Sequence, residues 1–184
     1  LPLELGATRE LHSFIMARGL YYEMESAGQL GIDENTREFG IVTGRSEPSI
    51  EPPILEYLVA YTYRIIGHES MGVARLYSIF FWTIGGLGFF LLARKILPLN
   101  GAFFALAFYL FNHFGAFYSR NFQPDPLMIM LIVWALYFQV VWSEKDSLSS
   151  AILAGLFTGL AVLVKAPAVF FVGVPMIGLL ISRG

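Results

Sequence analysis

The sequence contains no cysteine and few charged residues, and both shortages restrict what the chain can be. Without cysteine it can form no disulfide, no thiolate metal site and no cysteine nucleophile. Only 14% of the 184 residues are charged, whereas 56% are hydrophobic, so the chain is too apolar for a typical soluble domain. The mean hydropathy of +0.63 agrees, and the abundant apolar side chains exclude disorder. A net charge of -2 without a basic cluster gives no support to nucleic-acid binding.

The charged residues are concentrated near the start of the chain. Residues 1–70 hold 16 of them, 11 acidic and 5 basic, whereas residues 71–184 hold only 10. We therefore expect an extramembrane segment over residues 1–70 and a transmembrane bundle of about five helices over residues 71–184. The expected fold class is an all-α integral membrane protein.

Five apolar runs, bounded by charged residues or turn residues, are the candidates for membrane helices. They cover residues 76–92, 101–118, 126–142, 148–164 and 168–181. Each run has 14–18 residues, slightly fewer than the roughly 20 that cross a bilayer. Short connections rich in proline join several of them, so consecutive helices should run antiparallel.

Lysine and arginine in the connections predict the orientation in the membrane. In the connections after residue 70, the side of the membrane opposite residues 1–70 holds four of these residues. The side on which residues 1–70 lie holds two. The side with more lysine and arginine in its connections usually faces the cytoplasm. We therefore expect residues 1–70 on the outer side of a bacterial or archaeal plasma membrane. The four are Arg94, Lys95, Lys145 and Arg183, and the two are Arg120 and Lys165.

Within residues 1–70 the sequence predicts two helices, near residues 9–25 and 53–66, with a loop over residues 28–49. Apolar residues recur at helical spacing in the first helix. The second begins after two prolines, ends at Gly67 and is too short to span a bilayer. Its three tyrosines suit the membrane interface. We therefore expect both helices to be interfacial.

Several short motifs follow one another in a fixed order along the chain. The first is Ala17-Arg18, and the second begins with Glu51-Pro52-Pro53 and continues through Tyr57, Gly67 and the segment Ala74-Arg75-Leu76-Tyr77-Ser78. The third runs from Ser119 and Arg120 to Pro124-Asp125, and the fourth is Lys165-Ala166-Pro167. Their order, and their spacing relative to the apolar runs, resemble the GT-C superfamily of membrane glycosyltransferases.

The resemblance covers about residues 5–184 and is closest to dolichyl-phosphate-mannose protein mannosyltransferases and lipid A aminoarabinose transferases. It implies that the chain is the first large loop of that fold followed by helices two to six. Leu1 is not an initiator methionine and an apolar run almost reaches Gly184, so we expect a part of a longer protein. The implied activity is transfer of a sugar from a polyprenyl-phosphate donor to an acceptor at the outer membrane face.

That reaction needs a carboxylate for the acceptor and cations for the departing phosphate. The resemblance assigns the catalytic role to Glu51 and to Glu10, which matches the second member of a first-loop Asp-Glu pair. The aspartate itself has no counterpart, because Arg9 or His12 occupies its position and the first 32 residues contain no aspartate. Either Glu10 substitutes for the aspartate, or the chain is a degenerate relative, or the register in which the sequence is matched to the family motif is wrong.

Four further residues are candidates for substrate binding: Arg75, Lys165, Arg120 and Asp125. Lys165 either meets the polyprenyl phosphate or snorkels at the bilayer edge. Arg75 either serves the site or forms a structural ion pair with Glu51 or Glu69. Arg120 and Asp125 bracket a turn, where they bind each other, a metal or the acceptor, or cap the turn.

The sequence identifies no metal site, and a divalent cation stays open as a cofactor. The acidic residues Asp33, Glu34 and Glu38 form either a solvated loop or a weak site for such a cation. Two functions also stay open. The ordered motifs favour a glycosyltransferase, whereas the missing aspartate favours a non-catalytic transmembrane subunit of a larger membrane complex, derived from a GT-C relative. The expected partners are membrane lipids, the sugar donor and, for the subunit, other membrane proteins.

Overall fold

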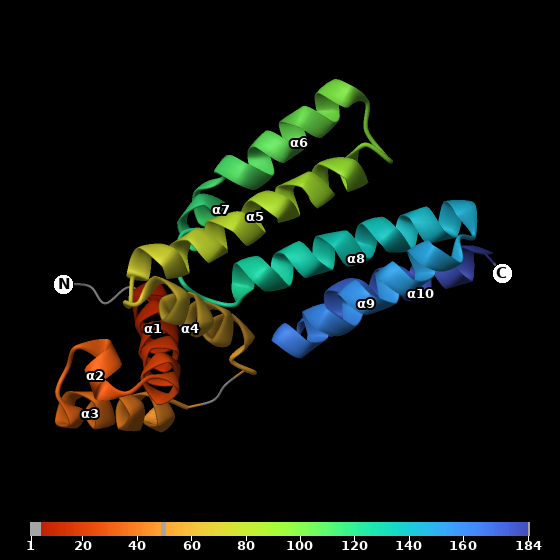
Figure 1. Cartoon of the computed structure of the whole chain (residues 1–184). Coiled ribbons are helices and arrows are strands. Elements are labelled where there is room, and N and C mark those ends of the chain that lie inside the picture. The colour runs from red at the N-terminus through yellow and green to blue at the C-terminus, as the bar shows by residue number, and fades with distance from the viewer. Residues whose placement is uncertain (1–4, 49–50, 184) are drawn as a thin grey trace. The chain divides into compact units, whose positions relative to one another are not determined.

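The computed structural model describes residues 5–48 and 51–183, which fold into helices joined by short connections, without a β-strand among them (Figure 1). The predicted all-α class is therefore confirmed. The chain divides into two units, and each is described by itself. The first unit comprises the chain up to Ser78 together with Arg120–Gln123, and the second comprises Ile79–Ser119 and the chain from Pro124 onward.

The first unit contains four helices and the first two turns of a fifth. They are α1 (Leu5–Met24), α2 (Ala27–Leu30), α3 (Glu34–Ser46), α4 (Ile54–Ile66) and the beginning of α5 (Met71–Ala93). Helix α1 packs against both α3 and α4. The core of the first unit is formed by small and aromatic side chains, among them Ala17, Tyr21 and Tyr63, which are almost fully buried. The two predicted helices thus correspond to α1 and α4.

The prediction of a loop over residues 28–49 is wrong, because most of this segment is α3. The carboxylate of Asp33 accepts a hydrogen bond from the backbone N–H of Thr36 at 2.9 Å and so caps the start of the helix. The glycines that indicated a loop serve packing instead. A Cβ atom on Gly44 would lie only 2.8 Å from the Cα atom of Gly19 on α1. Tertiary contact therefore overrides the low helix propensity of glycine.

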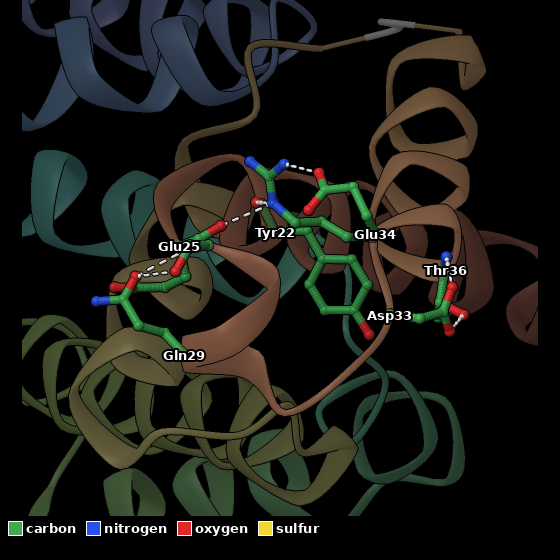
Figure 2. A network of polar contacts seen from close by, with 8 residues as sticks. Tyr22, Glu25, Gln29, Asp33, Glu34 and Thr36 are labelled. Atoms are coloured by element: carbon green, nitrogen blue, oxygen red, sulfur yellow. Dashed lines mark hydrogen bonds and ion pairs between the residues drawn. The ribbon is translucent and has the colours of Figure 1, made fainter.

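A polar network joins the end of α1 to the start of α3 (Figure 2). The Nε atom of Arg37 donates to the carbonyl oxygens of Tyr22 at 3.0 Å and Glu25 at 2.8 Å. The same guanidinium pairs with Glu34 at 2.6 Å. A cation at this position satisfies carbonyl groups that the end of a helix leaves without partners. Asp33 and Glu34, considered above for a cation site, thus take part in local helix structure.

The second unit contains the rest of α5 and five further helices. These are α6 (Leu99–Phe111), α7 (His113–Tyr118), α8 (Asp125–Lys145), α9 (Leu148–Val164) and α10 (Ala168–Arg183). Helices α8 and α9 pack side by side, and α10 contacts both (Figure 1). All five apolar runs are therefore helical. The run over residues 101–118 differs from the prediction, because it breaks at Asn112, whose side chain accepts from the N–H of Gly115 at 2.7 Å.

Glycines allow close packing at α5 but not at α9. A Cβ atom on Gly88 would lie 3.1 Å from the Trp134 ring, and one on Gly85 would lie 2.6 Å from the hydroxyl of Tyr109. By contrast, a Cβ atom on Gly155 or Gly159 would meet no described atom within 4 Å. Among the described residues, these two α9 glycines therefore do not serve close helix contact.

By length and composition, two of the described helices are able to cross a membrane: α5 and α8. Helices α6, α9 and α10 are also apolar but shorter. Large apolar side chains are exposed on all three, including Phe104 on α6 and Phe170 on α10. The fold is consistent with an integral membrane protein, and the number of spans stays a prediction.

Candidate functional site

One stretch of α1, residues 9–13, contacts several of the charged groups of the first unit. Four of its polar side chains each contact a partner far along the chain. The contacts are Arg9 with Glu51 at 3.5 Å, Glu10 with Arg75 at 2.7 Å, His12 with Glu47 at 2.6 Å and Ser13 with Glu56 at 2.7 Å. Because α1 is a continuous helix here, the four contacts lie within about two turns of one another. We take this cluster as the candidate site.

Glu10 and Arg75 form the best-defined contact of the candidate site. The Nε atom of Arg75 donates to Oε1 of Glu10 at 2.7 Å, and a terminal nitrogen donates to Oε2 at 3.2 Å. This bidentate arrangement is the strong form of an arginine–carboxylate pair. The prediction that Arg75 pairs with Glu51 or Glu69 is therefore wrong. The face of α1 that carries Glu10 is directed at the start of α5, a tertiary feature that no local pattern reveals.

Glu51 lies beside Arg9, at a distance of 3.5 Å between the charged atoms. The Glu51 side chain is 19% exposed and that of Arg9 is 42% exposed, so both groups reach solvent. Arg9 stands at one of the two positions where the resemblance places the missing aspartate. If the resemblance places the aspartate at Arg9 and not at His12, a positive charge faces Glu51 where the family has a negative one.

Glu56 is a buried carboxylate that the motif analysis missed. It is only 6% exposed and accepts a hydrogen bond from the hydroxyl of Ser13. Burial raises the pKa of Glu56, although the hydrogen bond from Ser13 opposes this change. A signal was present in the sequence: Glu56 shares the helical spacing of Val59, Ala60 and Tyr63, and so belongs to the buried face of α4.

Glu69 is a partly buried acidic group that interacts with residues nearer the other end of α1. Burial raises the pKa of Glu69, while the charge of Arg18 and a hydrogen bond from Tyr22 lower it. Arg18 belongs to the Ala17-Arg18 motif, and Ala17 is fully buried beside it. The motif thus combines a small residue for packing with a cation near a carboxylate.

Two of the remaining candidates meet in the second unit. The Nζ atom of Lys165, just after α9, lies 2.9 Å from Oδ1 of Asp125, the first residue of α8. Arg120 belongs to the first unit and is exposed. Glu10, Glu51 and Arg75 also belong to the first unit, whereas Lys165 belongs to the second, so a common role of all four in one reaction stays a prediction.

The residues that the structure describes contain no group of three or more histidine, aspartate or glutamate side chains able to hold a metal ion. A cation held by three or more such side chains therefore has no ligand set among the described residues. The polar groups of the candidate site pair with one another instead.

The described residues are all-helical and include two apolar helices of spanning length, which is consistent with a membrane protein. A family model described as dolichyl-phosphate-mannose-protein mannosyltransferase matches residues 50–184. The chain belongs to this family of membrane glycosyltransferases, which confirms the resemblance. The match includes Glu51, Arg75 and Lys165, whereas Glu10 lies before it. Searches of curated proteins and of solved structures found no significant match.

Proposed function

We propose that the protein transfers a sugar from a polyprenyl-phosphate donor to an acceptor hydroxyl or phosphate at the outer face of a plasma membrane. Membership of the mannosyltransferase family supports the lipid-linked donor and the membrane setting. The observation that carries the proposal is the cluster on α1, where the Glu10–Arg75 and Arg9–Glu51 pairs stand on adjacent residues. Acidic and basic groups side by side are what a transfer between an acceptor and a phosphate requires.

Each candidate residue has a role in this proposal. Glu51, assisted by Glu10, takes the acceptor proton as the acceptor oxygen forms a bond to the anomeric carbon of the sugar. The bond from that carbon to the phosphate oxygen breaks, and the phosphate keeps the electron pair. Arg75 and Lys165 stabilise the charge on the departing phosphate, while Arg120 and Asp125 orient the substrates. Residues 1–70, with interfacial α1 and α4, lie outside the membrane, and residues 71–184 form the transmembrane bundle.

A second candidate function, a non-catalytic transmembrane subunit of a larger membrane complex, has its own support. Arg9 faces Glu51 across 3.5 Å, and a nearby cation makes a carboxylate a weaker base. Glu10 is likewise neutralised by Arg75. In a subunit these pairs would hold α1, α4 and α5 together and would take no part in transfer.

The test is Glu51→Gln, which removes the charge of the side chain and preserves its shape. Transfer of labelled mannose from polyprenyl phosphate is measured in membranes, with thermal unfolding measured in parallel. We expect a rate loss of about 10²–10⁴-fold with little change in stability if Glu51 assists proton transfer. The matched control is Glu34→Gln, since Glu34 also pairs with an arginine but lies outside the α1 cluster.

Two results would contradict this proposal: the first would remove the role given to Glu51, and the second would reject the transferase itself. Unchanged transfer by Glu51→Gln removes Glu51 from the mechanism. A folded wild-type protein that transfers sugar from none of a panel of polyprenyl-phosphate donors supports the non-catalytic subunit instead.

A further inference from the structure

Glu56 is a charged residue where an apolar one is expected. It lies on the face of α4 that also carries Leu55, Val59 and Tyr63, all of them almost fully buried. A carboxylate is rarely buried to this degree unless it is paired, because the loss of hydration is costly. An apolar residue would fill the same position at lower cost. The contacts of Glu56 should therefore explain its presence.

These contacts link two helices. The hydroxyl of Ser13 on α1 donates to Oε1 of Glu56 across 2.7 Å in a buried environment. Glu56 also stands in the first turn of α4, where backbone N–H groups lack helical partners and favour a negative charge. The carboxylate thus fixes the beginning of α4 against α1.

The same two segments meet a second time at Glu51. Ser13 lies four residues after Arg9, so both side chains project from one face of α1. Arg9 contacts Glu51 and Ser13 contacts Glu56, which gives two parallel contacts between α1 and the chain at the start of α4. Only Pro52 and Pro53 separate Glu51 from the helix, and proline restricts the backbone between them.

The two contacts differ in how firmly they hold. The contact between Arg9 and Glu51 is long and partly exposed, so solvent screens it. The contact between Ser13 and Glu56 is short and buried, where a hydrogen bond to a carboxylate is stronger and its loss more costly. Of these two contacts, the buried one therefore contributes more to the position of the segment that carries Glu51.

We infer that Glu56 is a positioning residue, which holds Glu51 at the candidate site by locking the first turn of α4 to α1 through Ser13. This role rests on the proposed function where it concerns catalysis, since Glu51 is the residue that Glu56 would position. The geometric part of the inference stands independently of any activity.

The first experiment compares transfer by wild type, Glu56→Gln and Glu56→Ala well below their unfolding temperatures. The amide oxygen of glutamine still accepts from Ser13, so Glu56→Gln should keep kcat within about threefold of wild type. Alanine loses the contact, so Glu56→Ala should lower kcat at least tenfold with little change in the KM for the donor. Val59→Ala is the matched control, because Val59 is buried on the same helix face but has no side-chain group that could hydrogen-bond to Ser13.

Equal losses in Glu56→Ala and Val59→Ala would overturn the inference, because general loosening of α4 would then explain both. A loss in Glu56→Gln as large as in Glu56→Ala would also overturn it, since charge and not position would be decisive.

The second experiment needs no activity and separates this inference from the proposed function. The purified protein is treated with a water-soluble carbodiimide and an amine, and labelling of each carboxylate is followed by mass spectrometry. Labelling of Glu51 should rise several-fold in Glu56→Ala and Ser13→Ala but not in Glu56→Gln. Glu25, which pairs with Arg64 elsewhere in the first unit, is the internal control. Unchanged labelling of Glu51 overturns the positioning role even if the enzyme is active. If the labelling increases but the wild-type protein transfers no sugar, the positioning role stands and only the proposed function is rejected.

Discussion

The two units hold their helices together with different chemistry. In the first unit, α1 is tied to α4 and α5 by ion pairs and a buried hydrogen bond, including the bidentate pair of Glu10 and Arg75. In the second unit, aromatic rings and glycines dominate: Trp82 and Tyr109 stack at 4.3 Å, and Gly88 lies against Trp134. Within lipid, packing of small and aromatic residues replaces the hydrophobic effect as the source of helix association. In the second unit, ion pairs such as that of Lys165 with Asp125 lie at helix ends or in connections.

Replacing a glycine at a helix contact tests how tightly the helices of a unit pack. Among the substitutions considered, Gly44→Leu should lower the stability most. The new side chain would meet the backbone of Gly19, which cannot move aside as a side chain can. We expect a loss of about 3 kcal/mol, the upper end for overpacking, and a fall in Tm of roughly 6–12 °C. Thermal unfolding in detergent measures it. An unchanged Tm would show that α1 and α3 do not cross at this glycine pair.

Arg75→Gln tests how much the ion pairs stabilise the first unit, because it removes the bidentate pair of Arg75 and Glu10. Glu10 would keep most of its burial but lose its charged partner. Hydrogen bonds to charged groups contribute about 1.5–3 kcal/mol, so we expect a loss of about 2 kcal/mol in detergent unfolding. Arg45→Gln is the control, because the Arg45–Glu23 pair is more exposed and should contribute less than about 1 kcal/mol. Equal losses would contradict a special role for the Glu10 pair.

Burial of Glu56 predicts that the stability of the first unit depends on pH. Its pKa in the folded state is raised, so its protonated form fits the fold better than its charged form. The stability from this group is fully present below the unfolded pKa of about 4.3 and is lost as pH rises through the folded pKa. Glu56→Gln should therefore gain stability relative to wild type as pH rises, because the amide does not ionise.

The measurement for Glu56 is the difference in Tm between Glu56→Gln and wild type across pH 4–8. Ser13→Ala should make the pH dependence of wild type steeper, because it removes the hydrogen bond that lowers this pKa. A difference that stays constant over the whole range would refute the raised pKa.

Gly159→Ala in α9 should give the smallest change, in the opposite direction. A Cβ atom at this position would meet no described atom within 4 Å, so alanine gains helix propensity without a clash. We expect a gain of roughly 0.5–1 kcal/mol in unfolding experiments. A loss of stability would mean that another chain or segment packs against this face.

Local sequence features determined much of the helical framework. The apolar run over residues 148–164 predicts the bounds of α9, and the prolines before Ile54 together with Gly67 predict α4. Gly67 ends α4 with φ of 79°, a conformation that residues with a side chain rarely adopt. These signals act within a few residues, so they can be recognised without the fold.

Tertiary structure alone decided how the charged residues are partnered and which glycines pack. The sequence pointed to Glu10, Glu51 and Arg75 through motifs, but the choice of Glu10 as the partner of Arg75 depends on how α1 meets α5. The same holds for Ser13 and Glu56, which lie 43 residues apart. Helix periodicity says which residues share a face, but not which face of another helix it meets, because that depends on the packing of all helices at once. α3 therefore formed where glycines indicated a loop, since contact with α1 compensates for their low helix propensity.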